Sequence, residues 1–264
     1  MSNLSKAQLL FLKQQKQHRK IVQFSRIFIF VGFLLLWEFC SDRNIIDSFI
    51  FSSPKKVFLC FYEMFLDHSI FLHVGVTLYE TLISFIFVTI FSVLIALLLW
   101  FSNKLSEITE PVFIVLHRLP KSALAPLLIV WLGATPTTII VAGMSVALFG
   151  SILNLSASFK TVDPEKIKLI YTFGGTKRQV LTKIIIPNSI PTILSNTKVN
   201  IGLCLVGVVI GEFLAAKSGL GYLIIYSSQV FKMDWLLMSI CILCMIAMGL
   251  YGIIGWLEKL SHRI

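Results

Sequence analysis

Three long runs without a charged residue constrain this chain more than any other feature. Residues 81–101, 135–159 and 235–257 contain no Asp, Glu, Lys or Arg. Each run is long enough to cross a hydrocarbon core of roughly 30 Å as an α-helix, which takes about 20 residues. The runs are apolar on all sides and do not alternate polar with apolar residues, which disfavours a closed β-barrel. The sequence therefore predicts an all-α bundle in a membrane.

Three further apolar segments, residues 27–39, 111–131 and 199–216, bring the expected number of transmembrane helices to about six. The composition agrees, because 56% of the chain is hydrophobic and only 14% is charged, far from the values of a soluble domain. An even number of spans puts both termini on one side of the membrane. We expect residues 1–26 to form a basic cytoplasmic N-terminal arm and residues 27–264 to form the six-helix transmembrane domain.

The net charge of +10 could indicate a nucleic-acid-binding protein, so the positions of the Lys and Arg residues matter. They concentrate in residues 1–26, in residues 160–183 and at the C-terminus, all on the side that the predicted topology makes cytoplasmic. The bias toward that side is roughly three to one, in agreement with the positive-inside rule. The excess charge therefore reflects topology next to membrane lipid, and no nucleic-acid partner is expected.

Small residues recur at every fourth position in two of the later spans. Gly143 and Ala147 are four apart in one span, and Gly207 and Gly211 are four apart in another. This spacing lets membrane helices approach closely. We expect these four residues to lie at helix–helix contacts, which says nothing about cargo.

The span at residues 111–131 combines charge with helix-breaking prolines. Arg118 and Lys121 flank Pro120, and Pro126 follows in the same segment. A broken helix is tolerated in a membrane where protein or water satisfies the freed backbone groups. A charge against lipid costs at least about 2.5 kcal/mol, so both side chains are expected to face the bundle interior or an aqueous cavity. The alternative is that one of them snorkels to the cytoplasmic surface.

The cytoplasmic loop at residues 160–187 is too long for a simple connection. Its residues predict a short helix that begins with an N-cap aspartate and a proline, ends at paired glycines, and is followed by a second short helix. The residues that set these boundaries are Asp163, Pro164, Gly174, Gly175, Thr176 and, at the end of the second helix, Pro187.

The first helix of this loop carries apolar side chains that are expected to cluster toward one side, namely Ile167, Ile170, Tyr171 and Phe173. A cytoplasmic helix with an exposed apolar stripe needs a partner to cover it. The stripe could pack on the protein's own helix ends, or a groove in a separate soluble subunit could receive it. The residues alone leave both interpretations open.

Three separated motifs follow one another along the chain. Residues 118–133 read R-L-P-K-S-A-L-A-P-L followed by Trp131 and Gly133, and residues 209–223 read V-I-G-E followed by S-G-L-G-Y-L. Between them, the loop has the spacing G-x9-[apolar]-x-[apolar]-P at Gly174, Ile184, Ile186 and Pro187. Together they resemble the permease subunits of ATP-binding-cassette (ABC) importers, and among these the nitrate, sulfonate and taurine group. The loop departs from the family's E-A-A signature, where Lys168, Leu169 and Ile170 stand.

The resemblance implies a type I importer bundle in the bacterial inner membrane, built from two permease subunits that are usually identical. Each subunit would dock its loop helix on one of two cytoplasmic ATPase subunits, and an extracytoplasmic binding protein would deliver substrate. The chain has no G-x4-G-K-[ST] motif, so ATP would bind the partner, and the permease would be non-enzymatic, with no cofactor or metal. The expected cargo is a small anion such as a sulfonate, taurine or nitrate, with a thiamine-precursor pyrimidine or another small organic solute as the alternative.

In that framework, the candidates for the translocation path are Arg118, Lys121, Trp131 and Glu212. Glu212 could equally hold a neighbouring helix in place. An ion-coupled secondary carrier is the main rival, but it would show inverted repeats and paired carboxylates inside the membrane. The sequence has no convincing repeat and suggests only one deeply placed acid. A membrane enzyme would need a cluster such as H-E-x-x-H, which the chain lacks.

Overall fold

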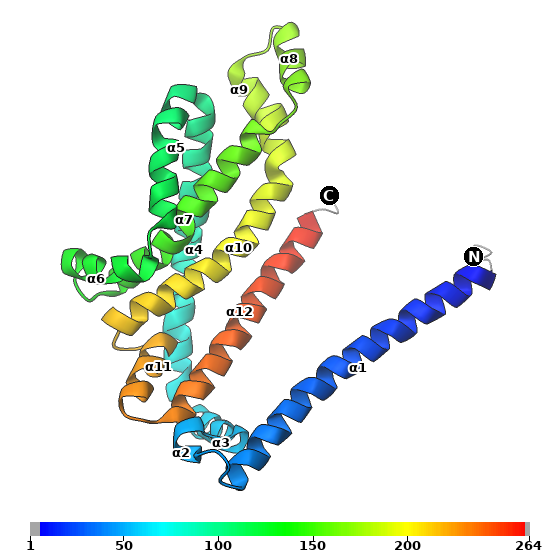
Figure 1. Ribbon diagram of the computed structural model, residues 1–264. Helices are drawn as coiled ribbons and strands as arrows, with labels where there is room; N and C mark the ends of the chain where they lie inside the picture. Colours follow the sequence, from blue (N-terminus) through cyan, green and yellow to red (C-terminus); the bar gives the residue numbers. More distant parts are fainter. Residues whose placement is uncertain (1–5, 262–264) are drawn as a thin grey trace.

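The computed structural model describes residues 6–261, and every regular element within that range is helical (Figure 1). Three helices precede the bundle: α1 (Lys6–Asp42), α2 (Ser48–Phe51) and α3 (Pro54–Leu66). The remaining elements are α4 (Ser69–Phe101), α5 (Asn103–Arg118), α6 (Lys121–Leu132), α7 (Pro136–Lys160), α8 (Pro164–Thr172), α9 (Lys177–Val180), a π-helical turn η1 (Leu181–Ile185), α10 (Ile186–Ala215), α11 (Leu220–Gln229) and α12 (Met233–Ser261). The predicted all-α class is confirmed.

Five helical segments are long and apolar enough to cross a membrane: Gln14–Asp42, Ser69–Phe101, Pro136–Lys160, Lys177–Ala215 and Met233–Trp256. A sixth span is present if the bent pair α5–α6 counts as one. These two helices meet at 98° across Leu119 and Pro120, because a proline disfavours helical backbone at the residue before it. The expected number of about six spans therefore holds as five or six, and the third is a broken helix.

Helix α1 leans away from the rest of the bundle and touches it near α3 (Figure 1). The helix runs through residue 26 without a break, so the predicted arm and the first span form one continuous element. Residues 1–5 of the predicted arm and residues 262–264 of the predicted domain lie outside the described residues. The division at residue 26 is thus a change of composition within one helix, and it stays a prediction.

Helix α7 lies at the centre, packed against α4 and against α10. A Cβ atom added at Gly207 of α10 would lie 2.8 Å from the Cα atom of Gly143 in α7, and one added at Gly211 would lie 3.1 Å from the Cα atom of Ile139. Ala147 is fully buried along the same helix. The helices approach one another at the four small residues that the spacing indicated, because larger side chains would not fit there.

Buried amides fasten α7 to α10 farther along the same contact. The side-chain amides of Asn196 and Asn200 donate hydrogen bonds to the Ser151 hydroxyl at 2.5 and 3.0 Å, and Asn154 donates to the Asn196 side-chain oxygen at 3.0 Å. Hydrogen bonds between membrane helices add about 1 kcal/mol each. The two helices that carry the α8–α9 loop are therefore held together by polar contacts as well as by close packing.

The two ends of the bundle differ in what they carry. Helices α8 and α9 lie at one end, whereas α2, α3 and α11 lie at the other (Figure 1). The N-terminal end of α1 and the C-terminal end of α12 both point away from α2, α3 and α11. A small core of Cys60, Met64, Ile70, Leu220, Leu223 and Met238 joins α3 and α11 to α4 and α12 at the second end.

Candidate functional site

Helix α8 is bounded by the signals that the sequence predicted. The Asp163 carboxylate caps the helix by accepting a hydrogen bond from the backbone N–H of Glu165 at 2.9 Å, and Pro164 occupies the first turn. At the other end, Gly174 has φ +75°, a left-handed conformation that favours glycine. The N–H of Gly175 donates to the Ile170 carbonyl at 2.9 Å, and a Cβ on Gly175 would lie 2.7 Å from that oxygen. The backbone conformation therefore favours glycine at position 174, and the close carbonyl oxygen favours glycine at position 175.

The second helix of the loop begins as predicted but does not end at Pro187. Thr176 and Gln179 form a reciprocal capping box at the start of α9. The chain then continues through the π-helical turn η1 into α10, and the Ile186 N–H donates to the Leu181 carbonyl. The wider turn places Pro187 near the beginning of α10, where a missing N–H disrupts little. The expected short helix is therefore the first part of one long helix.

The four apolar side chains predicted to share one side of α8 are separated in the structure. Ile167 and Ile170 are half-buried against a core formed by the ends of α4, α7, α9 and α10. Tyr171 and Phe173 are exposed, and Phe173 is 81% exposed. Leu169, which the sequence interpretation missed, is also exposed and lies four residues before Phe173 on the same side. We call Leu169 and Phe173 the exposed face of α8; Tyr171 is also exposed, but it lies two residues from each of them and therefore on another side of the helix.

The α8–α9 loop is fastened to the neighbouring spans. The Lys177 ammonium donates to the Phe101 carbonyl at the end of α4, at 2.8 Å, and lies over the Trp100 ring at 5.4 Å from its centroid. Ile167 and Ile170 reach the same core from α8. A displacement of α8 would therefore be passed to α4, α7 and α10 together.

Removing the cap of α8 tests this anchoring. We expect Asp163→Ala to destabilise α8 by about 1 kcal/mol, because the first-turn N–H of Glu165 loses its acceptor. Amide hydrogen exchange across residues 165–172 should rise about fivefold. Asp163→Asn, which keeps a side-chain oxygen, is the matched control and should exchange close to the unaltered rate. Equal exchange in all three proteins would show that the core contacts alone hold the helix.

Of the predicted path residues, Arg118 and Lys121 lie on either side of the break between α5 and α6, whereas Trp131 lies near the far end of α6. The Lys121 ammonium donates to the carbonyl of Leu116, near the end of α5, and lies 5.5 Å from the centroid of the Phe149 ring. Arg118 and Trp131 are exposed on the surface of this chain. Lys121 therefore satisfies a backbone group of the broken helix, as a break in a membrane requires.

Glu212, the fourth predicted path residue, lies near the C-terminal end of α10 in a network of buried hydrogen bonds. Its side chain is fully buried and accepts hydrogen bonds from the Thr77 hydroxyl at 2.6 Å and from the Gly221 N–H at 2.5 Å. Thr77 in turn accepts from the Leu220 N–H at 2.8 Å, and His73 contacts the backbone of Gly219 at 3.1 Å. Glu212 thus joins α4 to the turn before α11, in agreement with its alternative role of holding a neighbouring helix.

A second acid, Glu80 of α4, lies beside Glu212 and was missed by the sequence interpretation. The side chain of Glu80 is 1% exposed and lies one helical turn after Thr77, whose hydroxyl contacts Glu212. The expectation of a single deeply placed acid is therefore wrong. Glu80 was overlooked because it directly precedes the uncharged run at residues 81–101, whereas α4 begins eleven residues earlier in the folded chain, at Ser69.

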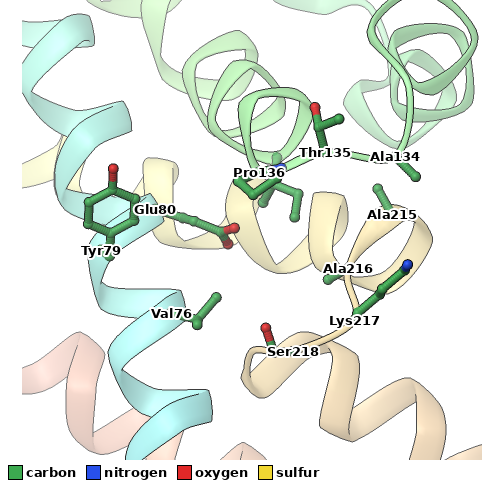
Figure 2. Close-up of a pocket in the computed structure, with 11 residues that line it drawn as sticks. Val76, Tyr79, Glu80, Ala134, Thr135, Pro136, Ala215, Ala216, Lys217 and Ser218 are labelled. Carbon is green, nitrogen blue, oxygen red and sulfur yellow. The ribbon is translucent and has the colours of Figure 1, made fainter.

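A cavity of about 430 Å³ opens next to Glu80, between α4, the start of α7 and the end of α10. Figure 2 shows the Glu80 carboxyl directed from α4 toward α10, with Thr135, Lys217 and Ser218 around the same space. The structure does not bring the four predicted path residues together, and none of them lines this cavity. Within residues 6–261, no group of three or more His, Cys, Asp or Glu side chains could hold a metal ion.

Comparison with known proteins places this arrangement in a family. Residues 88–261 match the family described as "Binding-protein-dependent transport system inner membrane component". The chain belongs to this family. It is therefore a non-catalytic, multi-pass inner-membrane component of such a transport system, which works with a solute-binding protein and an ATPase.

Relatives and solved structures agree with the assignment. A probable ABC transporter permease protein of Haemophilus influenzae is 28% identical over 87% of this chain and 93% of its own. The formylaminopyrimidine transport permease protein ThiX of Halalkalibacterium halodurans is 25% identical over 73% of this chain and 76% of its own. The taurine transport system permease protein TauC of Escherichia coli is 22% identical over 81% and 80% of the two chains.

The fold has a solved counterpart. A chain from the inward-facing MetNI methionine ABC transporter matches with a TM-score of 0.65, at 14% identity, over 74% of this chain and 96% of that chain. At this identity the match shows a shared fold only. The helices that it covers therefore form a bundle of the importer-permease kind, as the resemblance implied.

Proposed function

We propose that this family member forms half of the translocation path of an ABC importer and receives movement from a cytoplasmic ATPase through α8. The observation that carries the proposal is the exposed face of α8, an apolar surface on a helix whose opposite side is anchored in the bundle. Apolar residues exposed on a rigid cytoplasmic helix fit a groove on a partner. The residues of this coupling site are Asp163, Pro164, Ile167, Ile170, Leu169, Tyr171, Phe173, Gly174 and Gly175.

The apolar residues of α8 have two different surroundings, and this difference supports the coupling role. Ile167 and Ile170 tie the helix to α4, α7 and α10, while Leu169 and Phe173 remain exposed, where a partner could contact them. When ATP closes the partner dimer, two such helices would be drawn together, and the bundles would rock between inward-facing and outward-facing states. Nucleotide supplies the differential binding energy that shifts the two populations.

The topology that fits this mechanism has α8 and both termini in the cytoplasm. The basic residues 160–183 flank α8, and the ends of α1 and α12 point away from the end that carries α2, α3 and α11. Both features agree with the positive-inside rule. We further propose that the second permease subunit is a copy of this chain, which the family resemblance favours.

The cargo is proposed to be a small solute of the sulfonate, taurine or nitrate kind, with a pyrimidine precursor as the second candidate. Relatives named for taurine, aliphatic sulfonates and formylaminopyrimidine have similar identities of 22–25%. Lys121, which would suit an anion, is engaged by the Leu116 carbonyl, and Glu80 and Lys217 bring opposite charges to one cavity. The charged side chains in the structure therefore give less support to an anionic cargo than the sequence motif does.

Co-purification tests the proposal. The chain is expressed in membranes with a tagged candidate ATPase and extracted in mild detergent, and we expect the two to elute together in a one-to-one ratio. A nucleotide-binding protein of another family serves as the control partner. Failure of the chain to bind any ATPase of an importer of this family would contradict the proposal. Uptake of labelled sulfonates, nitrate and pyrimidines by the assembled importer then identifies the cargo.

A further inference from the structure

We propose that Glu80 and Glu212 form a proton-binding site, in which one proton shared between two buried carboxyl groups holds α4 against the turn between α10 and α11. The two side chains are 1% and 0% exposed, and Glu80 lies one helical turn after Thr77, whose hydroxyl contacts the Glu212 carboxylate. They come from elements far apart in the sequence, so the contact belongs to the folded state alone. This site does not depend on the proposed coupling role of α8.

The hydrogen bonds assign different roles to the two carboxyl groups. Both oxygens of Glu212 accept hydrogen bonds, Oε1 from the Thr77 hydroxyl and Oε2 from the Gly221 N–H. A carboxylate surrounded by donors is the ionised partner. Oε2 of Glu80 is buried and has no hydrogen-bond partner among the described residues. A proton on Glu80, directed to the Glu212 carboxylate, would satisfy both groups.

No Lys, Arg or His side chain among the described residues forms an ion pair with either carboxyl group. The ion pairs among the described residues are Lys160–Glu110 and Lys198–Glu258, and both lie elsewhere. From the surrounding elements, His73 of α4 contacts the Gly219 backbone, while Tyr79 of α4 and Lys217 of the α10–α11 turn line the nearby cavity. None of these forms an ion pair with Glu80 or Glu212. Two like charges in one buried site disfavour each other strongly, so one proton remains.

The proton has a structural consequence. Glu212 already fastens Thr77 of α4 to the Gly221 backbone, and the shared proton adds a second link from α4 through Glu80. Loss of the proton would replace this link by repulsion between α4 and α10. A link that depends on a bound proton is lost when that proton leaves, so rising pH disfavours the folded state.

The site is tested by measuring the thermal stability of the full-length chain as a function of pH. The chain is purified in a detergent without ester groups. We expect the apparent Tm of the unaltered protein to fall between about pH 6 and about pH 9, because the folding equilibrium constant loses up to about tenfold per pH unit. Glu80→Gln, which imitates a protonated carboxyl, should make this interval flat. The matched control Glu107→Gln, at an exposed position on α5, should behave as the unaltered protein does. The same pH-dependent fall in Glu80→Gln would overturn the proposal.

Infrared spectroscopy gives an independent readout that remains useful if Glu80→Gln folds poorly. The unaltered protein should show a protonated-carboxyl band at about pH 6, where exposed glutamates are ionised. The band should be lost at high pH, absent from Glu80→Gln and retained in Glu107→Gln. Absence of the band from the unaltered protein would overturn the proposal. Stabilisation by Na⁺ at high pH that Glu80→Gln lacks, without the band, would show a metal-cation site in its place.

Discussion

Replacing Glu212 by alanine is expected to destabilise the folded chain by about 2–6 kcal/mol, because two buried donors lose their shared acceptor. The Thr77 hydroxyl and the Gly221 N–H would lose their acceptor, and each buried group left without a partner costs about 1–3 kcal/mol. The turn before α11 would lose its link to α4. The protein should then accumulate poorly in membranes.

Unfolding of the detergent-solubilised chain by increasing denaturant measures this effect. Glu212→Gln is the matched control, because its amide oxygen can still accept one of the two hydrogen bonds, and it should lose clearly less stability than the alanine variant. A Glu212→Ala protein that unfolds at the midpoint of the unaltered chain would contradict the structural role of Glu212. Loss of uptake with unchanged stability would instead favour direct contact with cargo.

The double variant Leu169→Ser and Phe173→Ser is expected to reduce ATP-driven uptake strongly while leaving the permease folded. Both side chains are exposed, so their removal costs little stability in the isolated chain. At an interface, truncation of a dominant apolar residue costs at least about 2 kcal/mol, which weakens binding roughly thirtyfold. We therefore expect the ATPase to be lost during purification and uptake to fall by at least about tenfold.

Leu105→Ser is the control for this experiment. Leu105 is also an exposed leucine, it stands at the start of α5, and it lies outside the exposed face of α8. Its substitution removes apolar surface from the same end of the bundle without touching the proposed contact. Equal uptake by the double variant and the control would remove α8 as the site of coupling.

Much of the fold could be predicted because it depends on local signals. The charge-free runs predicted three of the spans, Asp163 and Pro164 predicted the start of α8, and the four-residue spacing of small residues in α7 and α10 matched the close approach of these helices. In each case the cause lies within a few residues of the effect. In a lipid bilayer such signals are strong, because a segment that crosses the hydrocarbon core must satisfy its backbone hydrogen bonds internally, as a helix does.

The features that escaped prediction depend on contacts between distant segments. The role of Glu80 depends on its position beside Glu212, and the sequence around either residue does not indicate that the two lie together. The exposed face of α8 is set by the core that receives Ile167 and Ile170, so helical spacing could not tell the inward side from the outward side. Continuation of the helix past Pro187 depends on a π-helical turn, which no pattern in the sequence indicates.

The presence of two buried acids also changes the argument against an ion-coupled carrier. Paired carboxylates in the membrane are a feature of such carriers, so one of the two sequence-based reasons for rejecting that class no longer stands, and the lack of a convincing inverted repeat is the other. Membership of the binding-protein-dependent family now carries the distinction. The Glu80–Glu212 pair is instead expected to act within one half of an ATP-driven importer.

Transport by purified components in liposomes tests the central claim most directly. The chain is reconstituted with its ATPase and its binding protein, and uptake of labelled solute is measured with ATP, without ATP, and with an ion gradient alone. We predict uptake only when ATP and the ATPase are both present. Solute accumulation by the chain alone, driven by an ion gradient, would contradict the account.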